Sequence, residues 1–322
     1  MIRKKILNNI ENDYNSEKEL IKKLDITKCK LEETIEQLEK KGYIINKTEK
    51  GYKLKDTPDI LEPFEIKRKL ETEIIGKTIH FYKEVKSTNT IATDFLKNGA
   101  EDGTIIVAES QKAGKSRKGR EWVSPKGGLW LTMILRPKIE IEYAPRLTLV
   151  AGVAVAKSLR ENFGLDATIK WPNDILINSR KICGILTEAI IEDDTLEGVL
   201  VGVGIDINND KSSLPEHLQS QTTTMSEELN EEISRAVVVQ SFFKTFEDLY
   251  LEFQKGNFGL IVNEWRKLSS TIGNRVKVYT GKRAIYADAV GIDKEGALIV
   301  ECRNGNLQRI VSGECIIQKP TR

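Results

Sequence analysis

The sequence predicts an α+β protein of several domains, and three observations support this. Residues 1–56 have the pattern of short helices followed by a hairpin, residues 66–270 alternate strands with helices, and residues 271–322 read as β throughout. A polar segment with two prolines, residues 57–65, separates the first two parts and is predicted to be a linker. A chain of 322 residues is long enough to bury a core in more than one of these parts.

The composition excludes several classes of protein. Charged residues make up 30% of the chain and hydrophobic residues 39%, as in ordinary soluble proteins, and the net charge of +2 indicates no polyanionic partner. The four cysteines form no CxxC pair, so a disulfide framework or a zinc site is not expected, and no other metal site is predicted. Neither a secretion signal nor an apolar run of about 20 residues is evident, which predicts a cytoplasmic protein without membrane contact.

The first part begins with apolar residues at helical spacing between Ile2 and Ile10. Ser16-Glu-Lys-Glu19 is a capping box that opens a second helix, and Thr27 caps a third helix, which we expect to end before Gly42. Two short strands, Tyr43–Asn46 and Gly51–Leu54, then complete the pattern of a winged helix-turn-helix. Such a module places its last helix in the major groove of DNA.

The charges of this first part favour DNA binding only weakly. Residues 1–60 hold 14 Lys and Arg against 12 Asp and Glu, a net charge of +2. Lys28 and Lys30 stand at the start of the third helix, as insertion into a groove requires, but acidic residues including Glu32 follow them and would face phosphates unfavourably. A module that binds protein or only tethers the rest of the chain is the alternative.

The second part predicts one mixed α/β domain with a large sheet. The expected strands are 79–82, 103–109, 128–135, 167–171, 182–186 and 199–203. The expected helices are 90–96, 144–162 and 234–253.

A basic, glycine-containing run lies between two of these strands. Five cations fall within nine residues, with two glycines and no acidic residue between them: Lys112, Lys115, Arg117, Lys118 and Arg120. Glycine lets backbone N–H groups turn toward an anion, and the cations neutralise its charge. The run therefore predicts a phosphate-binding loop at the edge of the sheet, with a solvated basic loop as the alternative.

Two familiar nucleotide motifs are excluded. Gly114-Lys-Ser116 ends like a P-loop, but Glu109 stands where the motif needs its first glycine. Gly202-Val-Gly204 begins like a dinucleotide fingerprint, but Ile207 stands where its third glycine belongs.

The third part predicts a small β-barrel. Its expected strands are 275–279, 285–290, 297–300 and 307–311, separated by turn residues such as Asn304-Gly305.

The order of motifs along the chain resembles that of biotin protein ligase, and specifically the bifunctional kind whose N-terminal winged helix represses biotin genes. The resemblance covers essentially the whole chain. It rests on Ser87-Thr-Asn89, Gln111 with the basic run, Lys170-Trp-Pro-Asn-Asp174, Lys181-Ile-Cys-Gly-Ile-Leu186, Gly202-Val-Gly-Ile-Asp-Ile-Asn208 and Ser312-Gly-Glu314. It implies a central domain like the class II aminoacyl-tRNA synthetase core and a C-terminal SH3-like barrel.

The resemblance also implies a two-step reaction. Biotin and ATP, with Mg²⁺ carried by the ATP, give biotinyl-5′-AMP, and a lysine of biotin carboxyl carrier protein then takes the biotin. Lys170 and Arg117 are the predicted catalytic residues, because fixed cations stabilise the charge that gathers on phosphorus. No protein nucleophile is needed, since the biotin carboxylate attacks. The scarcity of histidine, two residues in the chain, agrees with this.

The resemblance assigns binding roles to further residues. The predicted biotin-binding residues are Ser87, Thr88, Asn89, Gln111, Lys115, Ser116, Arg117, Trp122, Lys170, Gly184 and Gly204. Those for ATP or the adenylate are Lys115, Arg117, Arg120, Asn173 and Asn208. Those for DNA are Ser16, Glu17, Thr27, Lys28, Cys29, Lys30 and Thr34. Partners implied are the carrier protein, a biotin operator, and a second copy of the chain once the adenylate is bound.

The chain departs from the family pattern at the basic run. Lys115 and Ser116 stand where the family usually has arginine and glycine, which predicts a looser or slower adenylate step because lysine lacks the planar guanidinium fork. Asp206 replaces a common asparagine, so contacts to adenine nearby are in question. The alternatives are a ligase with a vestigial winged helix that binds no DNA, a biotin-sensing repressor without catalysis, and a lipoate ligase.

Overall fold

A computed structural model describes residues 2–281 and 283–318. The chain divides into two compact units, Met1–Arg68 and Lys69–Arg322, which are described separately. The last residues of the predicted third domain, 319–322, lie outside the described residues.

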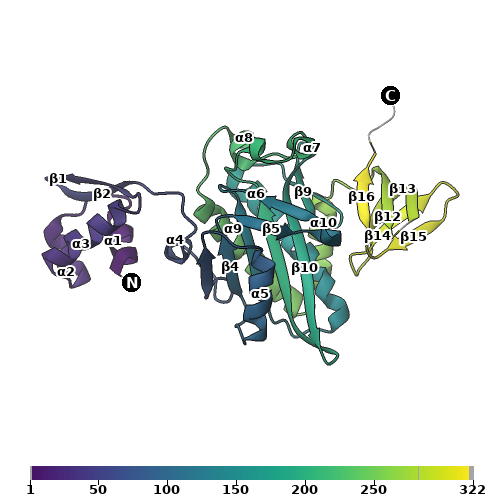
Figure 1. Ribbon diagram of the computed structural model, residues 1–322, viewed down its shortest axis with the longest axis horizontal. Coiled ribbons are helices and arrows are strands. Elements are labelled where there is room, and N and C mark those ends of the chain that lie inside the picture. The colour runs from purple at the N-terminus through teal and green to yellow at the C-terminus, as the bar shows by residue number, and fades with distance from the viewer. Residues whose placement is uncertain (1, 282, 319–322) are drawn as a thin grey trace. The chain divides into compact units, whose positions relative to one another are not determined.

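The N-terminal unit contains three helices and a hairpin (Figure 1). The helices are α1 (Ile2–Ile10), α2 (Glu17–Leu24) and α3 (Lys28–Glu39), and the hairpin pairs β1 (Ile44–Thr48) with β2 (Gly51–Asp56). The capping box at Ser16 is present, and the Thr27 side chain accepts a hydrogen bond from the Lys30 N–H at the start of α3. The apolar residues that predicted the helices form the core, among them Ile6, Leu20, Leu31 and Leu38.

The segment predicted as a linker ends in a helix, α4 (Pro63–Arg68), that belongs to the N-terminal unit. Its Glu65 and Arg68 are buried and form an ion pair of 2.7 Å. Arg68 also contacts Glu11 at 3.1 Å, and the Tyr43 hydroxyl donates a hydrogen bond to Glu65. These contacts fasten α4 to the body of the unit, which a pattern of prolines and acidic residues does not reveal.

In the second unit, the described residues form a 7-stranded sheet in the order β3-β4-β7-β11-β10-β9-β8. The strands β3 and β4 are parallel, and every other neighbouring pair is antiparallel. The bounds are β3 (Ile79–Tyr82), β4 (Thr104–Ala108), β7 (Leu129–Leu135), β8 (Thr168–Lys170), β9 (Asp174–Ile177), β10 (Arg180–Glu192) and β11 (Thr195–Ile205). All the predicted strands are present, while β9 and the great length of the β10–β11 hairpin were not predicted.

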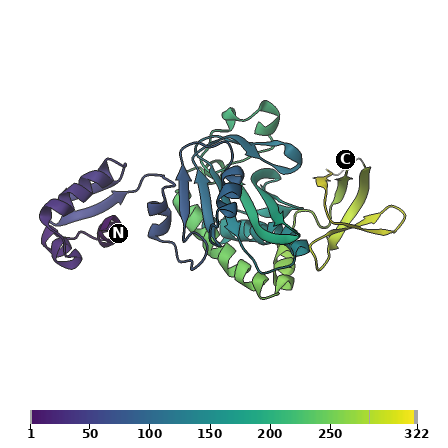
Figure 2. The ribbon, with the colours of Figure 1, turned by 60° about the horizontal axis from the view of Figure 1, so that its bottom comes forward.

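Helices cover both faces of this sheet. On one face lies α5 (Thr88–Lys97), which contacts β4, β7 and β11 (Figure 1). On the other lie α6 (Leu147–Phe163), α9 (Arg235–Gln254) and α10 (Phe258–Leu268), which pack against one another (Figure 2). Shorter helical segments are η2 (Ile141–Arg146), η3 (Lys211–Ser213), α7 (Glu216–Gln219) and α8 (Met225–Leu229). The central sheet therefore lies between α5 on one face and the group α6, α9 and α10 on the other.

The basic run is a hairpin, so the prediction of a plain loop was wrong. Strands β5 (Gln111–Lys115) and β6 (Glu121–Ser124) pair, and the short 3-10 turn η1 (Arg117–Gly119) joins them. Lys118 adopts a positive φ of 59° in this turn. Pairing of the two arms fixes where the cations of the run point.

The C-terminal part of this unit is a 5-stranded antiparallel sheet in the order β15-β14-β13-β12-β16 among the described residues. Its strands are β12 (Arg275–Thr280), β13 (Arg283–Ile292), β14 (Leu298–Cys302), β15 (Leu307–Ile310) and β16 (Glu314–Ile317). The Trp171 indole N–H donates to the Gly296 carbonyl at 3.2 Å and ties this sheet to the central domain. None of the described helices combines the length and the hydropathy that a membrane span requires.

Candidate active site

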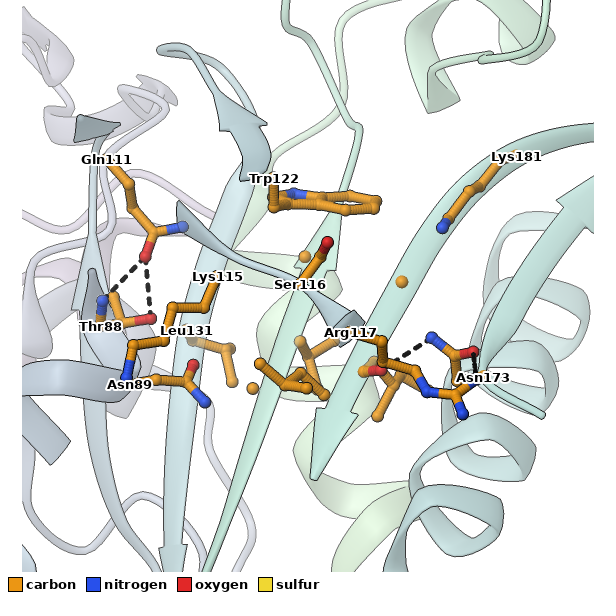
Figure 3. Close-up of a pocket in the computed structure, with 16 residues that line it drawn as sticks. Thr88, Asn89, Gln111, Lys115, Ser116, Arg117, Trp122, Leu131, Asn173 and Lys181 are labelled. Carbon is orange, nitrogen blue, oxygen red and sulfur yellow. Dashed lines mark hydrogen bonds between the residues drawn. The ribbon is translucent and has the colours of Figure 1, made fainter. Parts of the chain in front are cut away.

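A pocket lies between the β5–β6 hairpin, the start of α5 and the middle of strands β10 and β11 (Figure 3). The residues that line it are Thr88, Asn89, Gln111, Lys115, Ser116, Arg117, Trp122, Leu131, Asn173, Lys181, Gly184, Ile185, Leu186, Gly202, Val203 and Gly204. Most of the residues predicted to bind biotin or the adenylate thus lie together. Four of them, Ser87, Lys170, Arg120 and Asn208, do not line the pocket.

One wall of the pocket is polar and uncharged. The side-chain oxygen of Gln111 accepts hydrogen bonds from the Thr88 N–H at 2.8 Å and the Thr88 hydroxyl at 3.2 Å (Figure 3). Its amide nitrogen donates to the Ser124 hydroxyl at 2.8 Å. Ser87, immediately before α5, is 1% exposed, and its hydroxyl has no hydrogen-bond partner within the described part of the chain. A buried hydroxyl without a partner is costly unless a ligand satisfies it.

The facing wall is the indole of Trp122, which lies flat against two glycines. A Cβ at Gly184 would lie 2.7 Å from the Trp122 ring, and one at Gly204 would lie 2.5 Å from its Nε1. Glycine is therefore required at both positions so that the ring can approach the sheet. We predicted that these glycines admit a flat ligand, but in this structure the flat group that they admit is Trp122.

A cluster of cations closes the third side. The Lys181 ammonium lies 4.8 Å from the Trp122 ring centroid and pairs with Asp174 at 2.5 Å. Asp174 also pairs with Lys170 at 3.1 Å. Burial alone would raise the pKa of the Asp174 carboxyl, but Lys181 and Lys170 hold that pKa below its usual value. Two lysines thus share one carboxylate beside the pocket.

The structure gives these two lysines different positions relative to the pocket. Lys170, the predicted catalytic cation, touches Asp174 and stands behind it rather than in the pocket. Lys181 lines the pocket and received no role from the sequence, although its motif was recognised. Lys181 precedes Gly184 on the same strand and its side chain lies beside the Trp122 ring, but no short sequence pattern shows that it faces the pocket.

Arg117 reaches the pocket from the turn of the basic hairpin. Its guanidinium donates to the side-chain oxygen of Asn173 at 3.1 Å, and the Asn173 amide donates to the Ile185 carbonyl at 2.9 Å. Burial lowers the pKa of Arg117 from its usual value, against the attraction of Asp174. Asn173 thereby holds a partly desolvated cation above the sheet.

Arg120 points away from the pocket, which corrects its predicted contact with phosphate in this conformation. Together with Lys118 it contacts Glu314 of β16, at 3.0 Å and 3.3 Å. Burial raises the pKa of Glu314, but hydrogen bonds from Arg120 and Lys118 bring it below its usual value. The C-terminal sheet therefore holds the tip of the basic hairpin.

Asn208 and Asp206 are committed to internal contacts. The Asn208 amide donates to the Ile233 carbonyl at 2.7 Å, and its oxygen accepts from the Ile233 N–H at 3.0 Å, so its predicted contact with the adenylate is not available here. Asp206 is 3% exposed and accepts from the Asn209 amide at 2.9 Å. Burial raises the pKa of Asp206 to about 7.

The residues predicted to bind DNA lie in the N-terminal unit, and several have structural roles. Ser16 and Thr27 cap α2 and α3. Lys28 pairs with Glu17 at 3.0 Å, Lys30 pairs with Glu33 at 3.3 Å, and Cys29 is exposed. Thr34 is 2% exposed and its hydroxyl donates to the Lys30 carbonyl, so the surface of α3 does not present it to DNA and its predicted contact is corrected.

Comparison with known proteins identifies the family of the chain. Residues 81–206 match the Biotin/lipoate A/B protein ligase family, and residues 271–317 match the Biotin protein ligase C terminal domain. The chain is 36% identical to the bifunctional ligase/repressor BirA of Bacillus subtilis, over 94% of each chain, and 27% identical to that of Escherichia coli, over 94% of this chain and 92% of the other. The biotin protein ligase of Aquifex aeolicus, solved in complex with biotin and ATP, has 28% identity and a TM-score of 0.65 over 76% of this chain and 99% of its own.

Proposed function

Because this chain belongs to the biotin protein ligase family and is of the BirA type, we propose that its pocket converts biotin and ATP into biotinyl-5′-AMP. The biotin then passes to a lysine of biotin carboxyl carrier protein. The observation that carries this proposal is the convergence on one pocket of a neutral polar wall and the cations Lys181, Arg117 and Lys115. A carboxylate substrate and a triphosphate are both anions, so the cations overcome their mutual repulsion.

In the first step an oxygen of the biotin carboxylate forms a bond to the α-phosphorus of ATP. The bond from that phosphorus to the bridging oxygen of the β-phosphate breaks, and pyrophosphate leaves. Negative charge grows on the equatorial oxygens as the bond forms, and Lys181 and Arg117 stabilise it because they are fixed and partly desolvated. Lys170 acts at a distance by sharing Asp174 with Lys181.

In the second step an uncharged lysine amine of the carrier protein attacks the acyl carbon of the adenylate. The bond between that carbon and the phosphate oxygen breaks, AMP leaves, the amine nitrogen releases one proton to solvent, and an amide remains. We assign Mg²⁺ to the phosphates of ATP, because the described residues offer no group of three His, Cys, Asp or Glu side chains suited to a metal ion.

The neutral wall suits the ureido ring of biotin. Gln111 donates its amide nitrogen to Ser124, and Ser87, beside the pocket, buries a hydroxyl that finds no partner within the described residues. On the facing wall, the Trp122 indole nitrogen is likewise buried without a partner among those residues. A cyclic urea presents one carbonyl acceptor and two N–H donors at the same end of a flat molecule. Its binding would satisfy groups that are otherwise buried at a cost.

We further propose that the N-terminal unit is a winged helix that binds a biotin operator when two adenylate-bound copies of the chain associate. The order of three helices and a hairpin supports this, as do the names of the BirA relatives. The surface of α3 works against tight binding, because Lys28 and Lys30 are engaged by carboxylates. We assign the small C-terminal sheet to an SH3-like barrel and the central sheet to a core of the class II synthetase type.

One experiment separates these functions. The chain is incubated with labelled biotin, MgATP and carrier protein, and the same preparation is tested by gel shift on a palindromic operator, with and without ATP. We expect label on the carrier protein, and a shift that requires both biotin and ATP. Absence of label transfer by the folded chain would refute the ligase, and label transfer without a shift would refute the repressor alone.

A further inference from the structure

Two side-chain amides form the polar wall, and a different partner sets the orientation of each. An amide presents a carbonyl oxygen on one side and an NH₂ group on the other, and the two can exchange places by rotation. The Thr88 backbone N–H fixes the orientation of the Gln111 amide, because an N–H group can only donate and must therefore face the side-chain oxygen of Gln111. For Asn89 the partner is instead a side chain from another element.

That partner is Glu188, which projects from β10 toward α5. Its carboxylate accepts a hydrogen bond of 2.7 Å from the Asn89 amide nitrogen. An ionised carboxylate only accepts, so it holds the NH₂ group of Asn89 on its own side. Asn89 is 5% exposed and packs closely on the sheet, since a Cβ at Gly202 would lie 2.5 Å from its side-chain oxygen.

The side-chain oxygen of Asn89 joins a chain of hydroxyl contacts along the wall. Its oxygen faces the Thr132 hydroxyl at 2.8 Å, and that hydroxyl lies 2.8 Å from the Thr88 hydroxyl as well. The Thr88 hydroxyl in turn donates to Gln111. If Asn89 were reversed, its NH₂ group would face Thr132, and the Thr132 hydroxyl would have to accept from it rather than donate to it.

We propose that Glu188 is a positioning residue for biotin, which acts by holding the Asn89 amide in one orientation within the wall that faces the ureido ring. This inference deepens the proposed function and rests on it. Glu188 does not line the pocket, so its effect on the ligand is indirect. The cations Lys181 and Arg117, which we assign to the phosphates, lie on the other side of the pocket from Asn89, whereas Lys115 lies on the same side as Asn89 (Figure 3).

The test uses the full-length chain with Glu188→Met, which removes the acceptor, and Glu188→Gln, which keeps an acceptor but permits the reversed pair. Initial rates of pyrophosphate release give KM for biotin and for ATP. We expect Glu188→Met to raise the biotin KM about 10-fold, the size associated with a hydrogen bond to a charged group, and Glu188→Gln to raise it less. The ATP KM and kcat should stay within about twofold. Glu192→Gln, an exposed position on the same strand, is the matched control.

A double-mutant cycle keeps the inference testable if Glu188→Met also lowers stability. In an Asn89→Ala background, Glu188→Met should have no further effect on the biotin KM, because the residue it acts through is gone. An equal effect in both backgrounds, or equal rises in the KM of biotin and of ATP, would overturn the positioning role. The wild-type chain, assayed in parallel, reports on the ligase itself, so loss of the proposed function is distinguishable from loss of this inference.

Discussion

Lysines and carboxylates form compact clusters in two regions of this molecule, with opposite compositions. At the pocket, Asp174 stands between Lys170 and Lys181, so the cluster has one acid and two cations. On α3, Lys28 stands between Glu17 and Glu32, at 3.0 Å and 3.9 Å, so that cluster has one cation and two acids. The Asp174 side chain is 16% exposed and that of Lys28 is 60% exposed.

The contrast shows that a count of lysines does not identify an anion site. The pocket cluster retains a net positive charge in a partly desolvated place, where the interaction of charges is several times stronger than in water. The α3 cluster has a net negative charge and lies in solvent, where exposed ion pairs contribute little and salt screens them. The pocket is therefore organised for a phosphate, whereas α3 must rearrange its ion pairs before it can meet one.

The strongest test of this contrast removes the cation that lines the pocket. Lys181→Met should lower the rate of adenylate formation about 10²- to 10³-fold, because a fixed charge beside the reacting phosphorus is lost. Pyrophosphate release from biotin and ATP measures it. Lys244→Met, at an exposed position of α9 whose lysine also pairs with an aspartate, is the control and should be neutral. A loss below about threefold for Lys181→Met would remove the basis of the proposed mechanism.

The next test removes the shared carboxylate. Asp174→Asn should lower the same rate about 10- to 50-fold, because the amide cannot balance two ammonium groups and Lys181 loses the partner that positions it. Asp166→Asn, an exposed aspartate paired with Arg160, is the control. If Asp174→Asn forms the adenylate at the wild-type rate, the carboxylate does not position Lys181.

The same variant has a defined dependence of stability on pH. The pKa of Asp174 is lowered in the folded chain, so its ionised form stabilises the fold at neutral pH and this contribution is lost as the pH falls through the lowered pKa. The wild type should therefore unfold at a higher temperature than Asp174→Asn at pH 7. Well below the usual aspartate pKa of about 4, the difference should shrink toward zero. A constant difference across this range would contradict the assignment.

Much of the fold could be predicted from local sequence, because capping and periodicity are local. Ser16 and Thr27 start the predicted helices, and the apolar strands of the central sheet are present where they were expected. The hairpin at Gln111–Ser124 was missed, since its arms are polar and short and only their pairing stabilises them. The final strand, Glu314–Ile317, was also missed, because it is four residues long and gains its stability from β12.

The sequence was sufficient to predict which residues gather at the site, but less sufficient to predict what each residue does there. Motifs identified Thr88, Gln111 and Trp122 as site residues, each in a segment between predicted elements, and the structure places all three at one pocket. Which lysine faces the pocket depends on how β8, β9 and β10 pair, and the sequence does not encode that register in any short pattern. The internal hydrogen bonds of Asn208 were not anticipated for a similar reason, since its partner Ile233 is 25 residues away along the chain, and its contact with the adenylate stays a prediction.

A smaller effect is expected from Lys28→Ala on α3, which tests whether the exposed cluster contributes to operator binding. If α3 enters the major groove, this change should weaken operator binding about fivefold and reduce the slope of log affinity against log salt concentration by about one. The gel shift described above, repeated at several salt concentrations, measures both. Lys40→Ala, at the exposed end of the same helix, is the control. Equal affinity and slope for wild type and Lys28→Ala would show that this cluster does not contact DNA.

The smallest effect is expected from Lys115, which is intermediate between the two clusters because it lines the pocket yet is exposed. Lys115→Arg restores the planar fork that grips a phosphate through two hydrogen bonds, while leaving the charge unchanged. A change of hydrogen-bond geometry at a partly solvated position affects the rate less than a change of charge at a desolvated one. The rate of adenylate formation should therefore rise only about threefold, and adenylate release should slow by a similar factor. Stopped-flow measurement of both steps resolves them. Unchanged rates of adenylate formation and release would mean that Lys115 contributes only its charge. A rise in the formation rate as large as the loss caused by Lys181→Met would mean that the exposure of a cation in this pocket does not determine the size of its effect.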